Sequence, residues 1–439
     1  MKKEQEKEPE APSGAGVPPR RRIQTFKSLG NPDYLLFWVG NICNNIGMWL
    51  QMVTLGFLVW ELTKDPVTGQ GSAILSGTIG GLRFLPTLLV GPWAGVLADR
   101  MDRRKLVMVT QTFMAACAGS FALLILWLGV EGPGRLEVWH AYVYASIMAL
   151  AHGLLQPARQ ALIANTVPPE DLGNAFALNS MTVTSARLMG GVLGGSLIGA
   201  LGFKYNFFVE AGLLVIMVAL MVPMKVRYKE ASTARSNSPL RNLRDGMSYV
   251  WNENRVILHL ILMNFVLVFA FRPVQTLLPA YTGGVLGLED GAREGGFLLA
   301  AQGVGGMIGA FMIASVGYSL KKGQVSLIAL IVGSAAMVVF GQSHWLLLSL
   351  GMMAAMGMCQ TSFITSNLTL VQTMAPDRLR GRVTSIYMLE NGFGPLAILL
   401  IGAFIEVVGA GLAFSTVAAG CLAMAIYFQV FFSQVRSLK

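Results

Sequence analysis

Residues 95–105, GVLADRMDRRK, carry six charged side chains within seven positions, between two long apolar runs. A solvated loop would account for this charge. It would not account for an acid, Asp99, at the point where the first apolar run ends. The C-terminal end of a helix is the negative end of its dipole, so a carboxylate there is locally unfavourable. We therefore expect Asp99 to contact an arginine or the positive N-terminus of another helix.

Basic residues follow Asp99 closely. Arg100, Arg103 and Arg104 each present a forked set of donors that binds carboxylates or lipid phosphates. A simpler interpretation is that the cluster keeps this loop in the cytoplasm, and this interpretation explains Arg104 as well as a contact role does. That interpretation does not require an acid, so we favour a contact role for Asp99. Gly95, one turn earlier, would let its helix approach a neighbour closely.

Four further charged side chains lie deep inside apolar runs, namely Arg83, Arg187, Arg272 and Glu390. Placing one charge in hydrocarbon costs at least about 2.5–3.5 kcal/mol, so such residues mark a substrate or ion pathway. If these side chains face a central cavity, that cavity is net basic and suits an anionic or polar neutral substrate. Glu390 is then the candidate proton acceptor. The competing interpretation is a structural Arg–Glu pair that holds two parts of the protein together.

Uncharged polar residues also recur on helix faces. Asn41, Asn45 and Trp49 are spaced four apart and share one face of a helix. A second polar stretch contains Gln360 and Thr365. We expect these residues to line the same cavity. Hydrogen bonds between neighbouring helices are the alternative use.

The elements that must position these residues are membrane-spanning helices. Of the 439 residues, 54% are hydrophobic and 13% charged, against about 25% charged in soluble domains. The apolar runs are continuous rather than alternating, and each is near or above the ~20 residues that cross a bilayer. The sequence therefore predicts an all-α membrane protein with twelve transmembrane helices. Their expected ranges are 34–62, 72–98, 105–130, 138–163, 174–201, 204–225, 255–283, 294–318, 324–342, 344–371, 383–408 and 411–433.

The placement of lysine and arginine orients these helices. When the N-terminus is placed inside, only four of the 33 Lys and Arg residues fall in outer loops, namely Lys64, Arg135, Lys204 and Arg293. The positive-inside rule then puts both termini in the cytoplasm. The same asymmetry accounts for the net charge of +10, so we expect no nucleic-acid partner. The expected location is the cell (inner or plasma) membrane.

The chain divides into two similar halves. A long polar cytoplasmic segment, residues 226–254, separates six expected helices in 31–225 from six in 255–433. We expect residues 1–30 and 434–439 to be cytoplasmic tails, the first of them disordered because it is charged and rich in Pro and Gly. VPPEDLGNAFALNS and MAPDRLRGRVTSIY align at a constant offset and join equivalent helices of each half. Two halves around an axis along the membrane normal form a known transporter plan.

The segment 95–105 resembles the signature G-x-x-x-D-R-x-G-R-R/K between helices 2 and 3 of the major facilitator superfamily, with Asp102 where the consensus has Gly. Residues 156–180 and 375–387 are similar to the drug:proton antiporter branch that contains the enterobactin exporter and macrolide efflux proteins, in which Asp is common at position 102. The resemblance implies a cytoplasmic gate, in which Asp99 contacts the start of helix 11. The residues implied for this gate are Gly95, Asp99, Arg100, Arg103, Arg104 and Gly381.

A second resemblance lies in helix 5. ARLMGGVLGG, residues 186–195, is similar to the antiporter motif G-P-x-x-G-G, with Gly191 in place of the proline. The small residues Gly190, Gly191, Gly194 and Gly195 would form a smooth surface for packing against a helix of the other half. In the family this region is associated with export and with sealing against proton leak.

These features predict a secondary active transporter that exports a drug, siderophore or similar small molecule by alternating access, driven by the proton gradient. The alternatives are uptake or facilitated diffusion of a polar or anionic metabolite, and a non-transporting membrane receptor or scaffold. No nucleotide-binding Gly-rich loop or metal-ligand cluster occurs in the sequence, so we expect neither an enzyme, a cofactor nor a metal. The expected partners are the substrate, protons and the lipid bilayer, and the expected state is a monomer.

Overall fold

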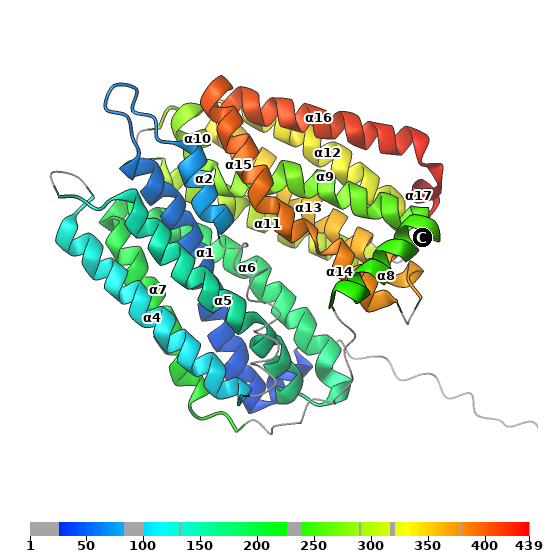
Figure 1. Ribbon diagram of the computed structural model, residues 1–439, viewed down its shortest axis with the longest axis horizontal. Coiled ribbons are helices and arrows are strands. Elements are labelled where there is room, and N and C mark those ends of the chain that lie inside the picture. Colours follow the sequence, from blue (N-terminus) through cyan, green and yellow to red (C-terminus); the bar gives the residue numbers. More distant parts are fainter. Residues whose placement is uncertain are drawn as a thin grey trace, which may run out of the picture.

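Figure 1 shows the computed structural model, which describes residues 26–82, 101–130, 134–225, 239–288, 291–316, 321–376 and 379–438. Within these ranges every regular element is a helix or a short 3-10 turn. Ten helical spans of the described chain are long and apolar enough to cross a membrane. The protein is therefore a multi-pass membrane protein.

The N-terminal half is built from long helices whose ends are fixed by local capping. Asn31, for example, starts the first helix by accepting the backbone N–H groups of Asp33 and Tyr34. The helices described in this half are α1 (Pro32–Leu62), α2 (Ala73–Leu82), α4 (Arg103–Leu128), α5 (Val138–Thr166), α6 (Leu172–Leu201) and α7 (Phe203–Met221).

Part of the expected N-terminal tail is folded. Residues Lys27–Gly30 form a 3-10 turn, η1, against a second one, η2 (Pro169–Asp171), at the start of α6. Lys27 Nζ lies 2.7 Å from Asp171 Oδ1, and the hydrogen bond and charge of this carboxylate raise the pKa of Lys27. The Ser28 hydroxyl donates to the Asp171 carbonyl. These contacts fix the entry to α1 on the N-terminal half.

The C-terminal half follows the same pattern with more breaks. Its helices are α8 (Pro239–Asn252), α9 (Arg255–Thr276), α10 (Leu278–Gly284), α11 (Ala292–Val316), α12 (Lys322–Gln342), α13 (Leu346–Met374), α14 (Arg380–Tyr387), α15 (Glu390–Val408), α16 (Ala410–Phe431) and α17 (Ser433–Ser437). Of these, α8 lies in the segment expected as a cytoplasmic loop, and Tyr249 and Val250 on it are buried.

Two expected helices are interrupted. The run 255–283 divides at Leu277 into α9 and α10, because Pro279 in the first turn of α10 has no N–H to continue the hydrogen-bond ladder. The run 383–408 divides into α14 and α15 at Met388 and Leu389. There the following sequence, ENGFGP, contains two glycines and a proline, residues with weak helix propensity.

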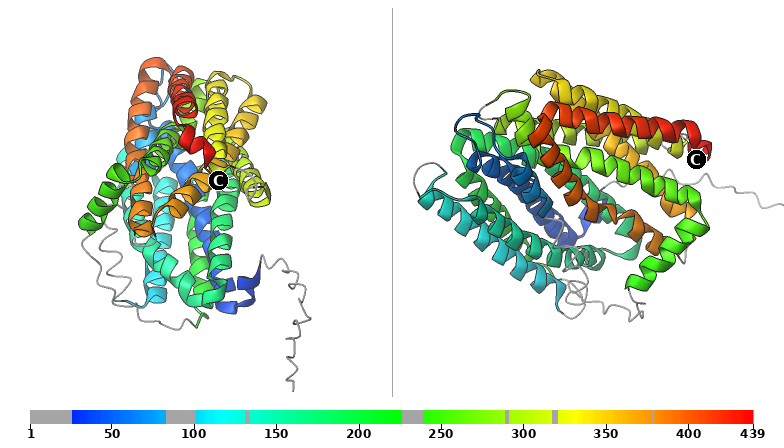
Figure 2. Two further views of the ribbon diagram at one scale, coloured as in Figure 1. Left: turned by 90° about the vertical axis from the view of Figure 1, so that its right-hand side faces the viewer. Right: turned by 45° about the horizontal axis from the view of Figure 1, so that its top comes forward.

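The most extensive contacts between the two halves are those of α6 with α11 and of α2 with α15. A Cβ on Gly402 of α15 would lie 3.2 Å from the carbonyl oxygen of Ala73 in α2. Both contacts lie toward the end of the bundle that carries α10 and the loop 63–72, here called the α10 end. Toward α8 and α14, the α8 end, the ribbons of the two halves diverge (Figures 1 and 2).

Each half has a buried apolar core, but the two cores are unequal. The core of the N-terminal half gathers residues of α1, α4, α5 and α7. The larger core fills the C-terminal half and extends across the interface to one face of α1, including Trp49, Val53 and Phe57. Helix α1 therefore contacts both cores and lies at the boundary between the two halves.

Four glycines let α6 touch two neighbours at close range. A Cβ on Gly190 would lie 2.5 Å from Trp49 Cβ, and one on Gly194 would lie 3.3 Å from Val53 Cβ, both on α1. Gly191 and Gly195 face the other half: a Cβ on Gly195 would lie 2.5 Å from the Ala292 carbonyl oxygen of α11. The single smooth surface expected from the sequence is therefore two surfaces, and the second of them joins the halves.

We predict that Gly195→Ala destabilises the protein whereas Gly199→Ala does not. The added methyl group at 195 meets backbone atoms of α11, and overpacking of this kind costs typically about 1–3 kcal/mol. At 199 the nearest atom, Arg293 Cβ, is 3.6 Å from the new Cβ, an ordinary contact. Thermal unfolding of the two purified variants measures the difference. Equal midpoints would contradict the close contact between α6 and α11.

Candidate functional site

Arg187 of α6 lies at the junction of three helices. Its guanidinium carbon is 4.8 Å from the centre of the Trp49 ring of α1, a cation–π distance. Its Nη1 donates to Oε1 of Gln360 in α13, 3.4 Å away. Because α13 belongs to the other half, Arg187 links the two halves about midway along the helices.

Arg272 of α9 contributes a second cation to the same region. Its side chain lies against α15, where a Cβ on Gly394 would be 3.0 Å from Arg272 Cδ. Arg187 and Arg272 are near enough to repel each other electrostatically. An anion held between them would relieve that repulsion, and the indole of Trp49 supplies an apolar face beside it. Thr365, over one turn along α13 from Gln360, is exposed.

Asn41 and Asn45 take part in a network inside the N-terminal half. Asn41 Nδ2 donates to Oδ1 of Asn179 in α6 at 2.7 Å, and Arg159 of α5 donates to Oδ1 of Asn41. Asn45 Nδ2 donates to the Asn41 carbonyl at 2.7 Å. These are hydrogen bonds between and along helices, the alternative use considered for the two asparagines.

Arg159 is a residue whose importance the sequence analysis missed. It is 8% exposed and lies within α5, seven residues before the helix ends at Thr166. Its signal in the sequence was an arginine inside the apolar run expected at 138–163, the same signal that identified Arg187.

The structure describes only part of the gate segment. Outside the described residues lie Arg83, Gly95, Asp99 and Arg100. Arg103 is buried in the first turn of α4. Arg104 Nε donates to the carbonyl of Met221 at 2.9 Å, and its Nη2 donates to that of Val222. Arg104 therefore binds carbonyls that the C-terminal end of α7 leaves without helical partners.

Asp102 has a local role in this segment. Its Oδ1 accepts the backbone N–H groups of Arg104 and Lys105, at 2.9 and 3.3 Å. It is therefore the N-cap of α4. An Asp directly before an apolar helix is a known start signal, so this role was available from the sequence.

We predict that Asp102→Ala lowers the free energy of unfolding by about 0.5–2 kcal/mol, the usual cost of losing such a cap. Asp102→Asn keeps an oxygen acceptor at the same place and should stay close to the unsubstituted protein. Thermal denaturation of both variants measures this. If Asn were as damaging as Ala, the charge of Asp102 rather than its acceptor would matter.

The remaining predicted positions lie on α14 and α15. Gly381 is in the first turn of α14, and open space surrounds the place of its missing Cβ within 4 Å. Glu390 is the first residue of α15 rather than a residue in mid-helix. Position 390 lies one turn before Gly394, the glycine that contacts Arg272.

Glu406 joins the halves at the α10 end. This residue lies in the last turn of α15, and its Oε1 accepts the Ser72 hydroxyl at 2.6 Å and the backbone N–H of Ile74 at 3.1 Å. The carboxylate therefore caps the N-terminus of α2, where the helix dipole favours a negative charge. Glu406 lies near the end of the expected helix 383–408, but the sequence could not supply its partner, which is 334 residues away.

The loop that contains Ser72 is stabilised by a carboxylate of its own, that of Asp65. Asp65 Oδ1 accepts the backbone N–H groups of Thr68 and Val67, and these bonds lower the pKa of Asp65. A depressed pKa keeps the turn stabilised as pH falls, until the pH drops through that lowered value.

We predict that Glu406→Gln loosens the contact between halves at the α10 end, because the neutral amide loses the attraction to the start of α2. Spin labels at Leu75 and Leu412, one on each half, should report a broader and longer distance distribution. A cysteine-free background avoids labelling Cys43, Cys117, Cys359 and Cys421.

Glu137→Gln is the matched control, since Glu137 precedes α5 within a single half. It should leave the distribution unchanged. If Glu406→Gln left it unchanged too, the cap on α2 would not hold the halves together.

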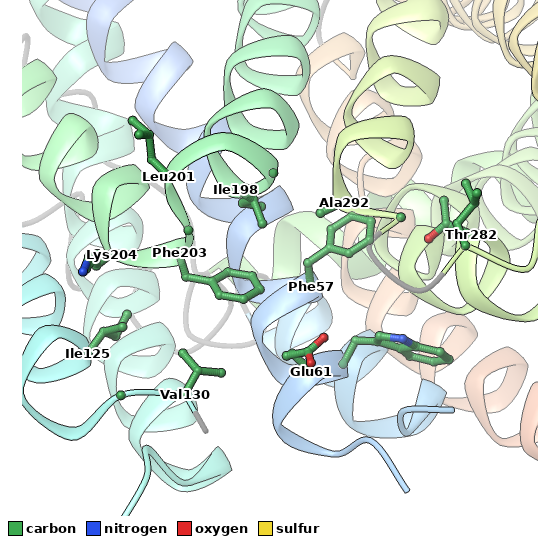
Figure 3. Close-up of a pocket in the computed structure, with 16 residues that line it drawn as sticks. Phe57, Glu61, Ile125, Val130, Ile198, Leu201, Phe203, Lys204, Thr282 and Ala292 are labelled. Carbon is green, nitrogen blue, oxygen red and sulfur yellow. The ribbon is translucent and has the colours of Figure 1, made fainter. Parts of the chain in front are cut away.

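A pocket of about 400 Å³ lies between the halves at the α10 end (Figure 3). Its wall includes Phe57, Glu61 and Phe203 from the N-terminal half and Thr282 and Ala292 from the C-terminal half. The volume falls within the roughly 300–1,000 Å³ of small-molecule sites. In the described part of the chain, no three His, Cys, Asp or Glu side chains come together as a metal site.

Comparisons with known proteins agree with this architecture. The profile of the Major Facilitator Superfamily matches residues 37–397. The staphyloferrin A transporter of Staphylococcus aureus is 24% identical over 390 residues, which cover 87% of this chain and 92% of that protein. The enterobactin exporter EntS of Shigella boydii is 26% identical over 326 residues, 73% of each protein. A crystal structure of the nucleoside transporter NupG, in mutant form, superposes with a TM-score of 0.70 at 12% identity, covering 91% of this chain and 100% of that one.

Proposed function

This chain belongs to the major facilitator superfamily, and from that premise we propose that it exports a siderophore-like or drug-like small molecule in exchange for protons. It is a secondary transporter and not an enzyme, and it resembles the branch of the family that exports drugs and siderophores. The observation that carries the proposal is the cluster of Trp49, Arg187 and Gln360, which draws residues of both halves to one place.

The proposed topology is twelve transmembrane helices with both termini in the cytoplasm of a monomer in the cell membrane. To the ten apolar spans it adds α2 and α6, which has 30 residues. The α8 end then faces the cytoplasm and the α10 end faces outward. The charge distribution supports this orientation, because Lys64 and Lys204 are among the few basic residues at the α10 end.

The proposed cycle alternates two contacts between the halves. In the present state Glu406 caps α2 and the glycines of α6 pack on α11, which closes the outer side. The opposite contact would form at the cytoplasmic side, between Asp99 and the start of α14 at Gly381, with Gly95, Arg100 and Arg103 beside it. Only one contact would hold at a time, so the central site would open to one side in turn.

The proposed substrate is anionic or carries a polar acidic group. Arg187 and Arg272 bring two guanidinium groups to the central region, and guanidinium groups bind anionic groups well. The Trp49 ring would pack against an aromatic or apolar part of the substrate. The printed names of the relatives from S. aureus and S. boydii, both concerned with siderophores, favour that class.

Glu390 is the proposed proton carrier of the C-terminal half. It stands at the start of α15, one turn from the glycine that contacts Arg272. A carboxyl group at this position would bind a proton from one side of the membrane and release it to the other as the halves alternate. The proton gradient then supplies the energy, and no cofactor takes part.

We predict gradient-dependent accumulation in inverted membrane vesicles that contain this protein. A panel of radiolabelled siderophores, macrolides and cationic dyes should include at least one compound that accumulates when an inward-acidic gradient is imposed. That accumulation should collapse on addition of a protonophore. Transport that ignores the gradient would contradict antiport, and accumulation only in right-side-out vesicles would favour the uptake alternative.

Glu390→Gln in the same vesicles tests the proton carrier. Gradient-driven accumulation should be lost while exchange of labelled for unlabelled substrate persists. Glu253→Gln is the control, since this exposed carboxylate beside α8 should be replaceable without effect. Retained accumulation in Glu390→Gln would remove Glu390 from the mechanism.

A further inference from the structure

A fully buried carboxylate lies inside the N-terminal half, away from the central cluster. Glu210 of α7 is 1% exposed. The Tyr144 hydroxyl of α5 donates to its Oε2 at 3.0 Å, and Gln51 Nε2 of α1 donates to the Tyr144 hydroxyl at 3.0 Å. Three side chains from three helices thus form one chain of hydrogen bonds that ends on a carboxylate.

Apolar groups enclose this chain. The Tyr144 ring stacks on Phe121 with ring centres 4.4 Å apart, and Phe207 packs edge-on to both rings. Gly47 of α1 lies against the stem of Glu210, with 3.6 Å between the place of its Cβ and Glu210 Cγ. A charged carboxylate among apolar groups is costly in free energy, so Glu210 needs either a strong partner or a proton.

Titratable groups near Glu210 are found on two neighbouring helices. Tyr144 contributes from α5, and Cys117 of α4 is near enough to interact electrostatically with Tyr144. From α1 the facing residues are Gly47 and Gln51, and α6 meets α7 one turn outward, at Asn206.

The direction of the hydrogen bonds depends on the charge of Glu210. As a carboxylate it only accepts, so the Tyr144 hydroxyl must donate to it and accept from the Gln51 amide. Once protonated, Glu210 can donate to the Tyr144 oxygen. The tyrosine proton then needs a new acceptor, which the Gln51 carbonyl oxygen supplies if the amide turns over. In that arrangement, one proton taken from water reverses both hydrogen bonds of the chain.

Two cavities lie near this chain of hydrogen bonds. Gln51 lines a cavity of about 30 Å³ together with His152, which is large enough for a water molecule. Ile125 and Phe203 line the large pocket at the α10 end. Ile125 lies one helical turn from Phe121, and Phe203 lies one turn from Phe207, and both of these phenylalanine rings pack on Tyr144.

We propose that Glu210 is a proton-binding site of the N-terminal half and that Tyr144 and Gln51 transmit its charge state to α1. Helix α1 also carries Trp49, two residues before Gln51, so the signal reaches the wall of the central cluster. The inference rests on the proposed proton coupling and adds a second proton site, in the half opposite to Glu390.

Proton binding can be measured without any substrate. In infrared difference spectra of the purified protein, recorded between about pH 5 and pH 9, protonation of a buried glutamate produces a carboxylic acid carbonyl band. We expect a band that Glu210→Gln removes. Tyr144→Phe should keep the band but shift its frequency, because the hydroxyl partner is lost. A spectrum unchanged by Glu210→Gln overturns the proposal.

Transport separates coupling from a purely structural role. Glu210→Gln should reduce gradient-driven accumulation by about tenfold or more while substrate exchange without a gradient persists. Glu210→Asp keeps a titratable group and should retain coupling. Asn206→Ser, one turn outward on α7 and equally buried, is the control and should retain both activities. If Glu210→Gln lost exchange and accumulation together while Glu210→Asp lost coupling too, the role would be structural and the proposal wrong.

The two proposals fail in different ways. If the unsubstituted protein shows no gradient-driven transport but the infrared band depends on Glu210, the proton site stands and antiport is wrong. If antiport is observed and Glu210→Gln accumulates substrate normally, antiport stands and the role of Glu210 in coupling is wrong.

Discussion

The contact of α6 with α11, backbone against backbone, is the constraint on which the rest of the structure depends. Ala292 and Gly296 of α11 lie so close to Gly195 that a single methyl group there has no room. This proximity brings α6 to the other half, and two turns further along it allows Arg187 to reach Gln360 of α13. Without it the central cluster would have no member from the other half.

Charge inside the bundle is tolerated because each buried group has a specific neighbour from another helix. Arg159 binds Asn41, Arg187 donates to Gln360, and Glu210 accepts from Tyr144. The first and third are confined to one half, so they stabilise that half as a unit. The second crosses the interface, so the proposed movement of the halves would have to change its geometry. Buried charge thus stabilises one half in the first case, and in the second it lies where the proposed transport cycle acts.

The sequence was sufficient to predict the helices, but it could not predict which side chains contact each other across them. Run length predicted the long helices well, because about 20 apolar residues have few uses other than crossing a bilayer. Spacing placed Asn41, Asn45 and Trp49 on one face, yet it could not say which neighbour each part of that face would meet. Trp49 meets Arg187, whereas Asn41 meets Asn179. Glu406 and Glu210 were visible as acids but their partners lie far away in the chain, a relation that only the folded structure supplies.

Helix α8 has a mechanical consequence for the connection between the halves. A Cβ on Gly246 would touch Ile386 at 2.9 Å and the backbone of Arg382 at 3.2 Å, so α8 is seated firmly on α14. The connection between the halves is therefore anchored on the C-terminal half through α8. A force applied to α8 would then be transmitted directly to α14, because the two helices are in close contact.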